Sequence, residues 1–97
     1  MKKFVLLHYG FVTPTKEIGE AWGKWFESIG DKMVDSGLPF SYGKEIARDG
    51  TVTEHPLSPD SITGYTIINA DSFDEAEAIA RTCPSIKSIR VYDTAPM

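Results

Sequence analysis

The sequence predicts a small α+β domain of the ferredoxin-like type, with the element order β-α-β-β-α-β and a four-stranded antiparallel sheet. Segments with helical periodicity alternate with segments rich in β-branched and aromatic residues. With 97 residues, the chain has the length of one domain built around one core, spanning residues 1–97. The two helices of this fold cover one face of the sheet and leave the other face bare.

The first element is a strand over residues 3–9, in which nearly every side chain is apolar. Alternation puts Phe4, Leu6 and His8 on one face and Val5, Leu7 and Tyr9 on the other. Both faces therefore need a cover, and the helices supply only one. We expect a second copy of the chain to supply the other, in a homodimer that joins the two sheet faces.

The first helix is predicted over residues 14–36. Thr13 is its expected N-cap, Pro14 its first helical residue, and Gly37 suits a left-handed cap after its end. Its apolar residues recur at spacings near 3.6 and form one stripe, made of Ile18, Trp22, Trp25, Phe26, Ile29 and Met33.

Gly19, Gly23 and Gly30 interrupt this helix and fall on one line at the edge of the apolar stripe. Each lowers helix stability by about 1 kcal/mol relative to alanine. A line without side chains lets the sheet, a partner chain or a ligand approach closely, and packing on the sheet is the plainest of these interpretations.

The middle of the chain predicts a second strand over residues 38–48 and a short returning strand over 51–54. Asp49-Gly50 is the turn signal between them, so the two strands form a hairpin. Residues 55–60 contain two prolines and read as a loop.

The remaining elements complete the order of the fold. Residues 62–71 form the clearest strand, rich in β-branched side chains. A capping box at residues 72–75 opens a second helix over 73–82, which ends before Pro84. Residues 85–92 alternate and supply the last strand.

Composition and charge exclude several classes of function. The formal net charge of −4 argues against non-specific nucleic-acid binding, which needs a basic surface. The single cysteine, Cys83, excludes a disulfide framework and a zinc site of several cysteines. No nucleotide-binding glycine motif occurs, and no apolar run approaches a membrane span in length. The apolar start of the chain is too short for a secretory signal.

The segment GYTIINADSFDEA, from Gly64 to Ala76, and the Cys83-Pro84 pair resemble the YCII-related family, most of all its DGPF-type members. The opening FVLLHYG and Gly43 fit the same pattern. This resemblance implies a ferredoxin-like fold and a homodimer with facing sheets, the dimeric α/β-barrel arrangement. It also implies a cytoplasmic protein.

The resemblance implies a chemistry similar to that of muconolactone isomerases, with a histidine on the first helix as the candidate catalyst. In this sequence Trp25 stands at the matching position, and the first helix has no histidine. The DGPF motif is also absent, since the corresponding loop reads HPLSPD over residues 55–60. Acid–base chemistry from the helix is therefore not carried over.

His8 becomes the candidate catalytic residue, because imidazole exchanges protons near neutral pH. The alternative is a buried histidine bonded to the backbone or to a dimer partner. Five aromatic residues are the candidate ligand-binding wall, with core or interface packing as their alternative: Tyr9, Trp22, Trp25, Tyr42 and Tyr65. His8 and His55 have no metal-ligand spacing, so no metal site is expected.

Together these observations predict a small-molecule-binding or cofactor-free isomerase- or cyclase-like module that acts as a homodimer. Its ligand would be a small aromatic or carbonyl compound, with no cofactor, nucleic acid or membrane involved. One alternative is a non-catalytic dimeric protein-interaction or regulatory module. Another is a monooxygenase-like enzyme on the same dimeric α/β-barrel fold.

Overall fold

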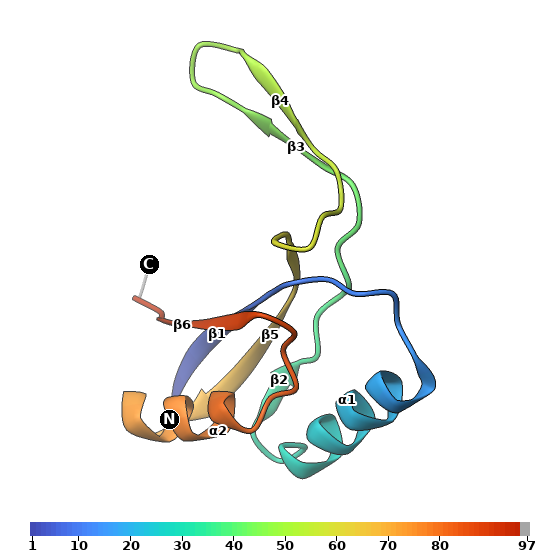
Figure 1. Ribbon diagram of the computed structural model, residues 1–97. Coiled ribbons are helices and arrows are strands. Elements are labelled where there is room, and N and C mark those ends of the chain that lie inside the picture. Colours follow the sequence, from blue (N-terminus) through green and yellow to red (C-terminus); the bar gives the residue numbers. More distant parts are fainter. Residues whose placement is uncertain (96–97) are drawn as a thin grey trace.

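The computed structural model describes residues 1–95, which form a four-stranded sheet, two helices and a separate hairpin (Figure 1). The elements are β1 (Lys2–Tyr9), α1 (Lys16–Ser28), β2 (Met33–Asp35), β3 (Gly43–Ile46), β4 (Val52–His55), β5 (Ile62–Ala70), α2 (Phe73–Arg81) and β6 (Ser88–Asp93). The strands of the sheet lie in the order β2-β5-β1-β6, and all neighbours are antiparallel. With the hairpin set aside, this is the predicted ferredoxin-like fold, and the sheet of one chain is open.

The two central strands are held by their inward-facing side chains. Phe4, Leu6 and His8 of β1 are buried, and so are Thr66 and Ile68 of β5. The register pairs Phe4 with Ile68 and Leu6 with Thr66, so these side chains form adjacent rows under the helices. Burial of each large apolar side chain contributes about 1.5–3 kcal/mol.

The helices complete the core from one side of the sheet. Trp25 of α1 and Ile29 just after it are buried, as are Ala76 and Ala80 of α2. The small alanines let α2 lie close to the sheet. The Trp25 indole donates to the Thr82 hydroxyl at 3.0 Å, which joins the two helices across the core.

The start of α1 lies two residues later than predicted. Thr15, rather than Thr13, is the N-cap, and its hydroxyl accepts a hydrogen bond from the Ile18 N–H at 3.2 Å. The helix begins at Lys16, so Pro14 lies in the preceding loop. Either threonine satisfies the capping preference, and only the side-chain geometry distinguishes them.

The predicted C-terminal part of this helix, up to residue 36, is wrong. The chain leaves the helix at Ile29 and Gly30, and Met33–Asp35 pairs with β5 as the edge strand β2. Met33 lies opposite Ile68 in this pairing. An apolar residue at this position fits a helical stripe and a strand equally well, and the free edge of β5 decides between them.

The predicted strand over residues 38–48 is also wrong in its first half. Pro39 makes only an isolated bridge with Gly64, and Gly43–Ile46 belongs to the hairpin. The hairpin itself is confirmed, with Gly50 at a φ of +94° in its turn. Figure 1 shows this hairpin standing away from the sheet and the helices.

The line of helical glycines does not pack on the sheet, contrary to the plainest interpretation. A Cβ built at Gly19 or Gly23 meets no atom of the described residues within 4 Å beyond its chain neighbours and the helix backbone. Gly30 lies after the end of the helix, where a Cβ would meet only the carbonyls of Phe26 and Glu27. Over residues 1–95, neither helix has the length and apolar character needed to cross a membrane.

Candidate functional site

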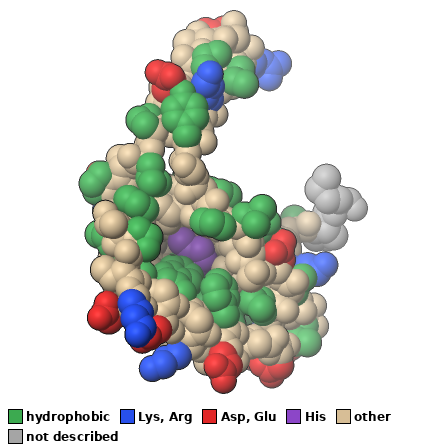
Figure 2. All heavy atoms as spheres, turned by 90° about the vertical axis from the view of Figure 1, so that its right-hand side faces the viewer, with side chains coloured by type: hydrophobic (Ala, Val, Ile, Leu, Met, Phe, Trp, Pro, Cys, Tyr) green, Lys and Arg blue, Asp and Glu red, His purple; other side chains and the backbone are tan. Residues whose placement is uncertain are grey.

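A cavity of about 400 Å³ opens between α1 and the end of the sheet where β1 stops and β5 starts. Its walls come from the loop after β1, α1 from its first turn to its last, the loop after β2, the first half of β5 and the residues before β6. Figure 2 shows a histidine at the bottom of this hollow, ringed by hydrophobic side chains. A space of this size holds a small organic molecule.

His8 is the floor of the cavity and is only 5% exposed. Its Nε2 lies 2.9 Å from the Thr66 hydroxyl, and its Nδ1 lies 3.1 Å from the Ser85 hydroxyl. The Thr66 hydroxyl donates to the Ser36 carbonyl at 3.5 Å, so its oxygen accepts from Nε2–H. This assignment leaves the lone pair of Nδ1 on the side of Ser85.

The environment of His8 keeps its ring neutral. Burial lowers the pKa of His8 from 6.5 to about 4, because the protonated ring would lose its hydration. The two nitrogens face hydroxyl groups and no carboxylate of the described residues. At neutral pH the ring is thus unprotonated and able to accept a proton, as a weaker base than free imidazole, and an anion formed beside it would raise its pKa again.

Cys83 and Ser85 extend the polar cluster on the Nδ1 side. The Cys83 sulfur lies 3.3 Å from the Ser85 hydroxyl and 3.7 Å from His8 Nδ1. Burial raises the pKa of the Cys83 thiol, which keeps it protonated and a poor nucleophile. Of these two residues, Ser85 is the one that lines the cavity.

Trp22 and Phe26 of α1 form the aromatic wall above the histidine. The Trp22 ring meets the His8 ring edge to face, with 4.9 Å between centroids. Phe26 lies beside Trp22, 5.8 Å away. Both side chains are only half-buried, so a ligand in the cavity can reach their rings.

Of the predicted site residues, the structure brings His8, Trp22 and Tyr65 to the cavity. Tyr65 lies at its edge, and its hydroxyl donates to Asp35 at 3.3 Å. Trp25 is 3% exposed and belongs to the core behind Trp22. For Trp25, therefore, the alternative of core packing holds in place of a ligand-binding role.

Tyr9 and Tyr42 lie outside this cavity. Tyr9 is on the opposite face of the sheet, where the Arg90 guanidinium sits 5.1 Å from its ring centroid. Tyr42 lies at the base of the hairpin, where its hydroxyl donates to Glu54. Together with His55, it lines a separate hollow beside Phe40.

Sequence reasoning missed Thr66 and Ser85, the two partners of His8. Thr66 lies on the inward-facing side of its strand, as its position in the alternation indicates. Its position relative to β1 depends on how the two strands are paired, and the sequence of one strand does not show that pairing. Ser85 follows the Cys83-Pro84 end of α2, and no sequence signal links that turn to a residue 77 positions earlier.

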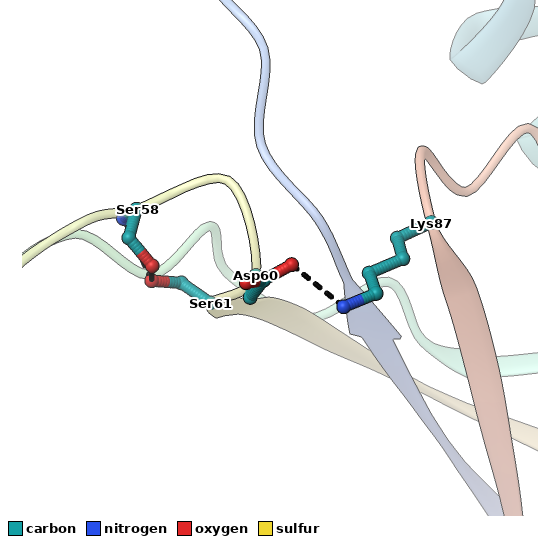
Figure 3. A network of polar contacts seen from close by, with 4 residues as sticks. All are labelled: Ser58, Asp60, Ser61 and Lys87. Atoms are coloured by element: carbon teal, nitrogen blue, oxygen red, sulfur yellow. Dashed lines mark hydrogen bonds and ion pairs between the residues drawn. The ribbon is translucent and has the colours of Figure 1, made fainter.

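Three loops are tied together beside the cavity, and Figure 3 shows the ion pair that joins two of them. The Lys87 ammonium pairs with Asp60 at 2.6 Å, and the hydroxyls of Ser58 and Ser61 lie 3.0 Å apart. The Gly10 N–H donates to the Ser61 carbonyl at 2.8 Å. A Cβ at Gly10 would lie 2.6 Å from that of Lys87, and its φ is +102°, so this crossing requires glycine.

The titratable residues of the chain do not assemble a metal site within residues 1–95. No group of three or more histidine, cysteine, aspartate or glutamate side chains in this range converges on one point. The site is therefore described by its hydroxyls, its imidazole and its apolar walls.

No protein-family model matches the chain, and no curated protein matches it in sequence. A solved structure with a similar fold is the 5-chloro-2-hydroxyhydroquinone dehydrochlorinase TftG from Burkholderia phenoliruptrix AC1100, in complex with 2,5-dihydroxybenzoquinone. The sequences are 15% identical, the TM-score is 0.56, and the match covers 96% of this chain and 93% of that one. At this identity the likeness shows the fold alone, and the YCII-related assignment stays a prediction.

Proposed function

We propose that this chain is a YCII-like module that binds a small uncharged aromatic or carbonyl compound above His8. In this proposal His8 carries a proton in a cofactor-free isomerisation or cyclisation. The observation that supports it is a neutral imidazole, buried at the floor of an apolar cavity, with its Nδ1 lone pair beside a cavity-lining hydroxyl.

The lining of the cavity favours an uncharged ligand. Among the described lining residues there is no aspartate, glutamate, lysine or arginine. Its side-chain polar groups are few, and those nearest His8 are the hydroxyls of Thr66 and Ser85. An ion that enters such a site loses its hydration without gaining an opposite charge, which costs several kcal/mol in real proteins.

The proposed proton transfer uses only groups of the chain. The Ser85 hydroxyl oxygen takes a proton from a carbon next to a carbonyl, or from a ring hydroxyl, while it passes its own proton to His8 Nδ1. When the proton leaves a carbon, the electron pair of the broken C–H bond moves to the carbonyl oxygen; when it leaves a hydroxyl, the pair stays on that oxygen. The Thr66 contact holds the imidazole ring in place. Return of the proton to another atom of the ligand completes an isomerisation with no oxidant or reductant.

The likeness to TftG supports this choice of ligand as an analogy between folds. That protein was solved with 2,5-dihydroxybenzoquinone, a flat ring that carries hydroxyl and carbonyl groups. A single ring fits within a cavity of about 400 Å³. The analogy gives no residue correspondence, so the role of His8 depends on its surroundings in this chain.

We also propose a homodimer through the face of the sheet opposite the helices. Val5, Leu7 and Ile67 point to that face and are only half-buried within one chain. A second copy would remove these apolar side chains from water. Light scattering at micromolar concentration should give the mass of two chains, and Leu7→Glu should give the mass of one. A wild-type monomer would contradict this part of the proposal.

The test of the proton-carrying role uses resorcinol in deuterated buffer. We expect the protein to speed the exchange of the ring C–H protons for deuterium, followed by NMR. His8→Gln should slow the exchange by about a hundredfold or more, the usual share of a general base. His55→Gln in the hairpin is the matched control and should leave the rate unchanged. Exchange at the buffer rate with the wild-type chain would refute the proposal.

The second candidate is a non-catalytic dimeric interaction module. Its support is the hairpin, where Ile46 and Val52 expose 73% and 54% of their surface as directly paired neighbours. A partner protein that covered this projecting apolar pair would remove it from water. This candidate predicts that resorcinol and similar rings change neither the melting temperature nor the tryptophan emission.

A further inference from the structure

Gly19 is a cavity-lining glycine within α1, and nothing in the fold of one chain requires a glycine at this position. Its φ is not positive, and a Cβ built on it meets no atom of residues 1–95 within 4 Å beyond its chain neighbours and the helix backbone. By contrast, Gly37 needs its positive φ and its close approach to Tyr65. Alanine at position 19 would give a more stable helix, so the glycine has a cost without a structural return.

The cavity gives that glycine a role. Gly19 lines the cavity on the same face of α1 as Trp22, which lies one helical turn after it. Because a Cβ there would meet no side chain within 4 Å, the missing side chain leaves this part of the cavity open. Gly23 has the same open surroundings but does not line the cavity.

We propose that Gly19 is a specificity-determining residue, where a flat ligand ring lies directly against the backbone of α1. This inference rests on the proposed small-molecule site and adds the position that limits the width of the ligand. A side chain at position 19 would occupy the space between the helix backbone and the ring. The ligand class is therefore a planar ring whose face, rather than its edge, meets the helix.

Gly19→Leu and Gly23→Leu form a matched pair for the test, and the two alanine variants accompany them. Gly19→Ala and Gly23→Ala should both raise the melting temperature, by about 4–8 °C if the full difference in helix propensity is realised. Gly19→Leu should weaken the binding of resorcinol by about tenfold or more, the effect of an overfilled site. Gly23→Leu should bind like the wild-type chain.

Acrylamide quenching of tryptophan fluorescence provides a readout that does not depend on the ligand. Trp22 borders the cavity and Trp25 is buried, so quenching reports mainly on access to Trp22. Gly19→Leu should reduce this quenching, and Gly23→Leu should not. Because alanine and leucine are favourable in helices, loss of folding does not confuse the comparison.

Each result decides a different claim. Unchanged resorcinol affinity and unchanged quenching in Gly19→Leu would overturn the role of Gly19 while leaving the proposed function intact. Equal effects of the two leucine variants, together with a change in oligomeric mass, would overturn it in favour of a partner chain on the glycine line. A wild-type chain that binds no resorcinol would remove the ligand and the inference together, even if quenching still changes.

Discussion

The layered body and the β3–β4 hairpin contain the same kind of antiparallel pairing but opposite degrees of burial. Ile68 in β5 is completely buried, whereas Ile46 in β3 exposes 73% of its surface. Both lie in antiparallel ladders; the register of β3–β4 is continuous, and that of β1–β5 shifts only between His8 and Tyr9, away from Ile68. Local pairing is thus present in both regions, and only the body adds a helical layer that removes the apolar side chains from water.

The hairpin is specified by its turn. The Asp49 carboxylate accepts a hydrogen bond from the Thr51 N–H at 2.9 Å, and Gly50 takes the positive φ that closes the turn. Ile46 faces Val52 at the last pair before the turn. Two strands without a covering layer are marginally stable, so the hairpin forms as an appendage of the body.

The largest expected effect on stability comes from comparing the same substitution, isoleucine to alanine, in the two regions. Ile68→Ala in the body should lower the free energy of unfolding by about 2–5 kcal/mol, because it leaves a cavity in the core. Ile46→Ala in the hairpin should change it by less than about 0.5 kcal/mol, as exposed sites do. Urea denaturation measures both. A loss of similar size at Ile46 would show that another chain covers the hairpin in solution.

The next effect compares the two histidines. The pKa of His8 falls from 6.5 to about 4 in the folded chain. Between these two pH values the His8 imidazole is protonated in the unfolded chain and neutral in the folded chain. Stability should therefore fall as the pH falls through this window. The loss should be about 2 kcal/mol after allowance for solvent at the cavity mouth.

Urea midpoints at about pH 7 and about pH 4.5 test this dependence. His8→Gln should flatten the difference between the two midpoints, because it removes the titrating group. His55→Gln in the hairpin is the control and should retain the wild-type difference. The same slope in all three proteins would show that His8 is hydrated in both states.

The smallest effect lies at the joint between the regions, where Lys87 before β6 pairs with Asp60 in the loop after the hairpin. Both side chains are largely exposed, 56% and 76%. A double-mutant cycle with Asp60→Ala and Lys87→Ala should give a coupling of about 0.2–1 kcal/mol, smaller at high salt. A coupling energy that does not change with salt concentration would mean that the pair is shielded from solvent.

The elements that sequence patterns predicted well are those with local signals. An apolar run placed β1, a run rich in β-branched residues placed β5, and the capping box placed α2, where the Ser72 hydroxyl accepts from the Glu75 N–H at 3.1 Å. The error at the end of α1 came from Met33, whose apolar side chain fits both the 3.6-residue period of the helix and the two-residue period of a strand. His8 was found from its place in the apolar strand, but its partners Thr66 and Ser85 were not.

By itself the sequence determined the fold class, the inward parity of His8, the N-cap of α2 and the hairpin turn, because each depends on residues close together in the chain. Only the tertiary structure decided that residues 33–35 join the sheet, that Trp25 is core while Trp22 is wall, and that Gly19 borders a cavity. The reason is physical. Strand register and the packing of a helix on a sheet depend on contacts between residues distant in sequence, which no local pattern records.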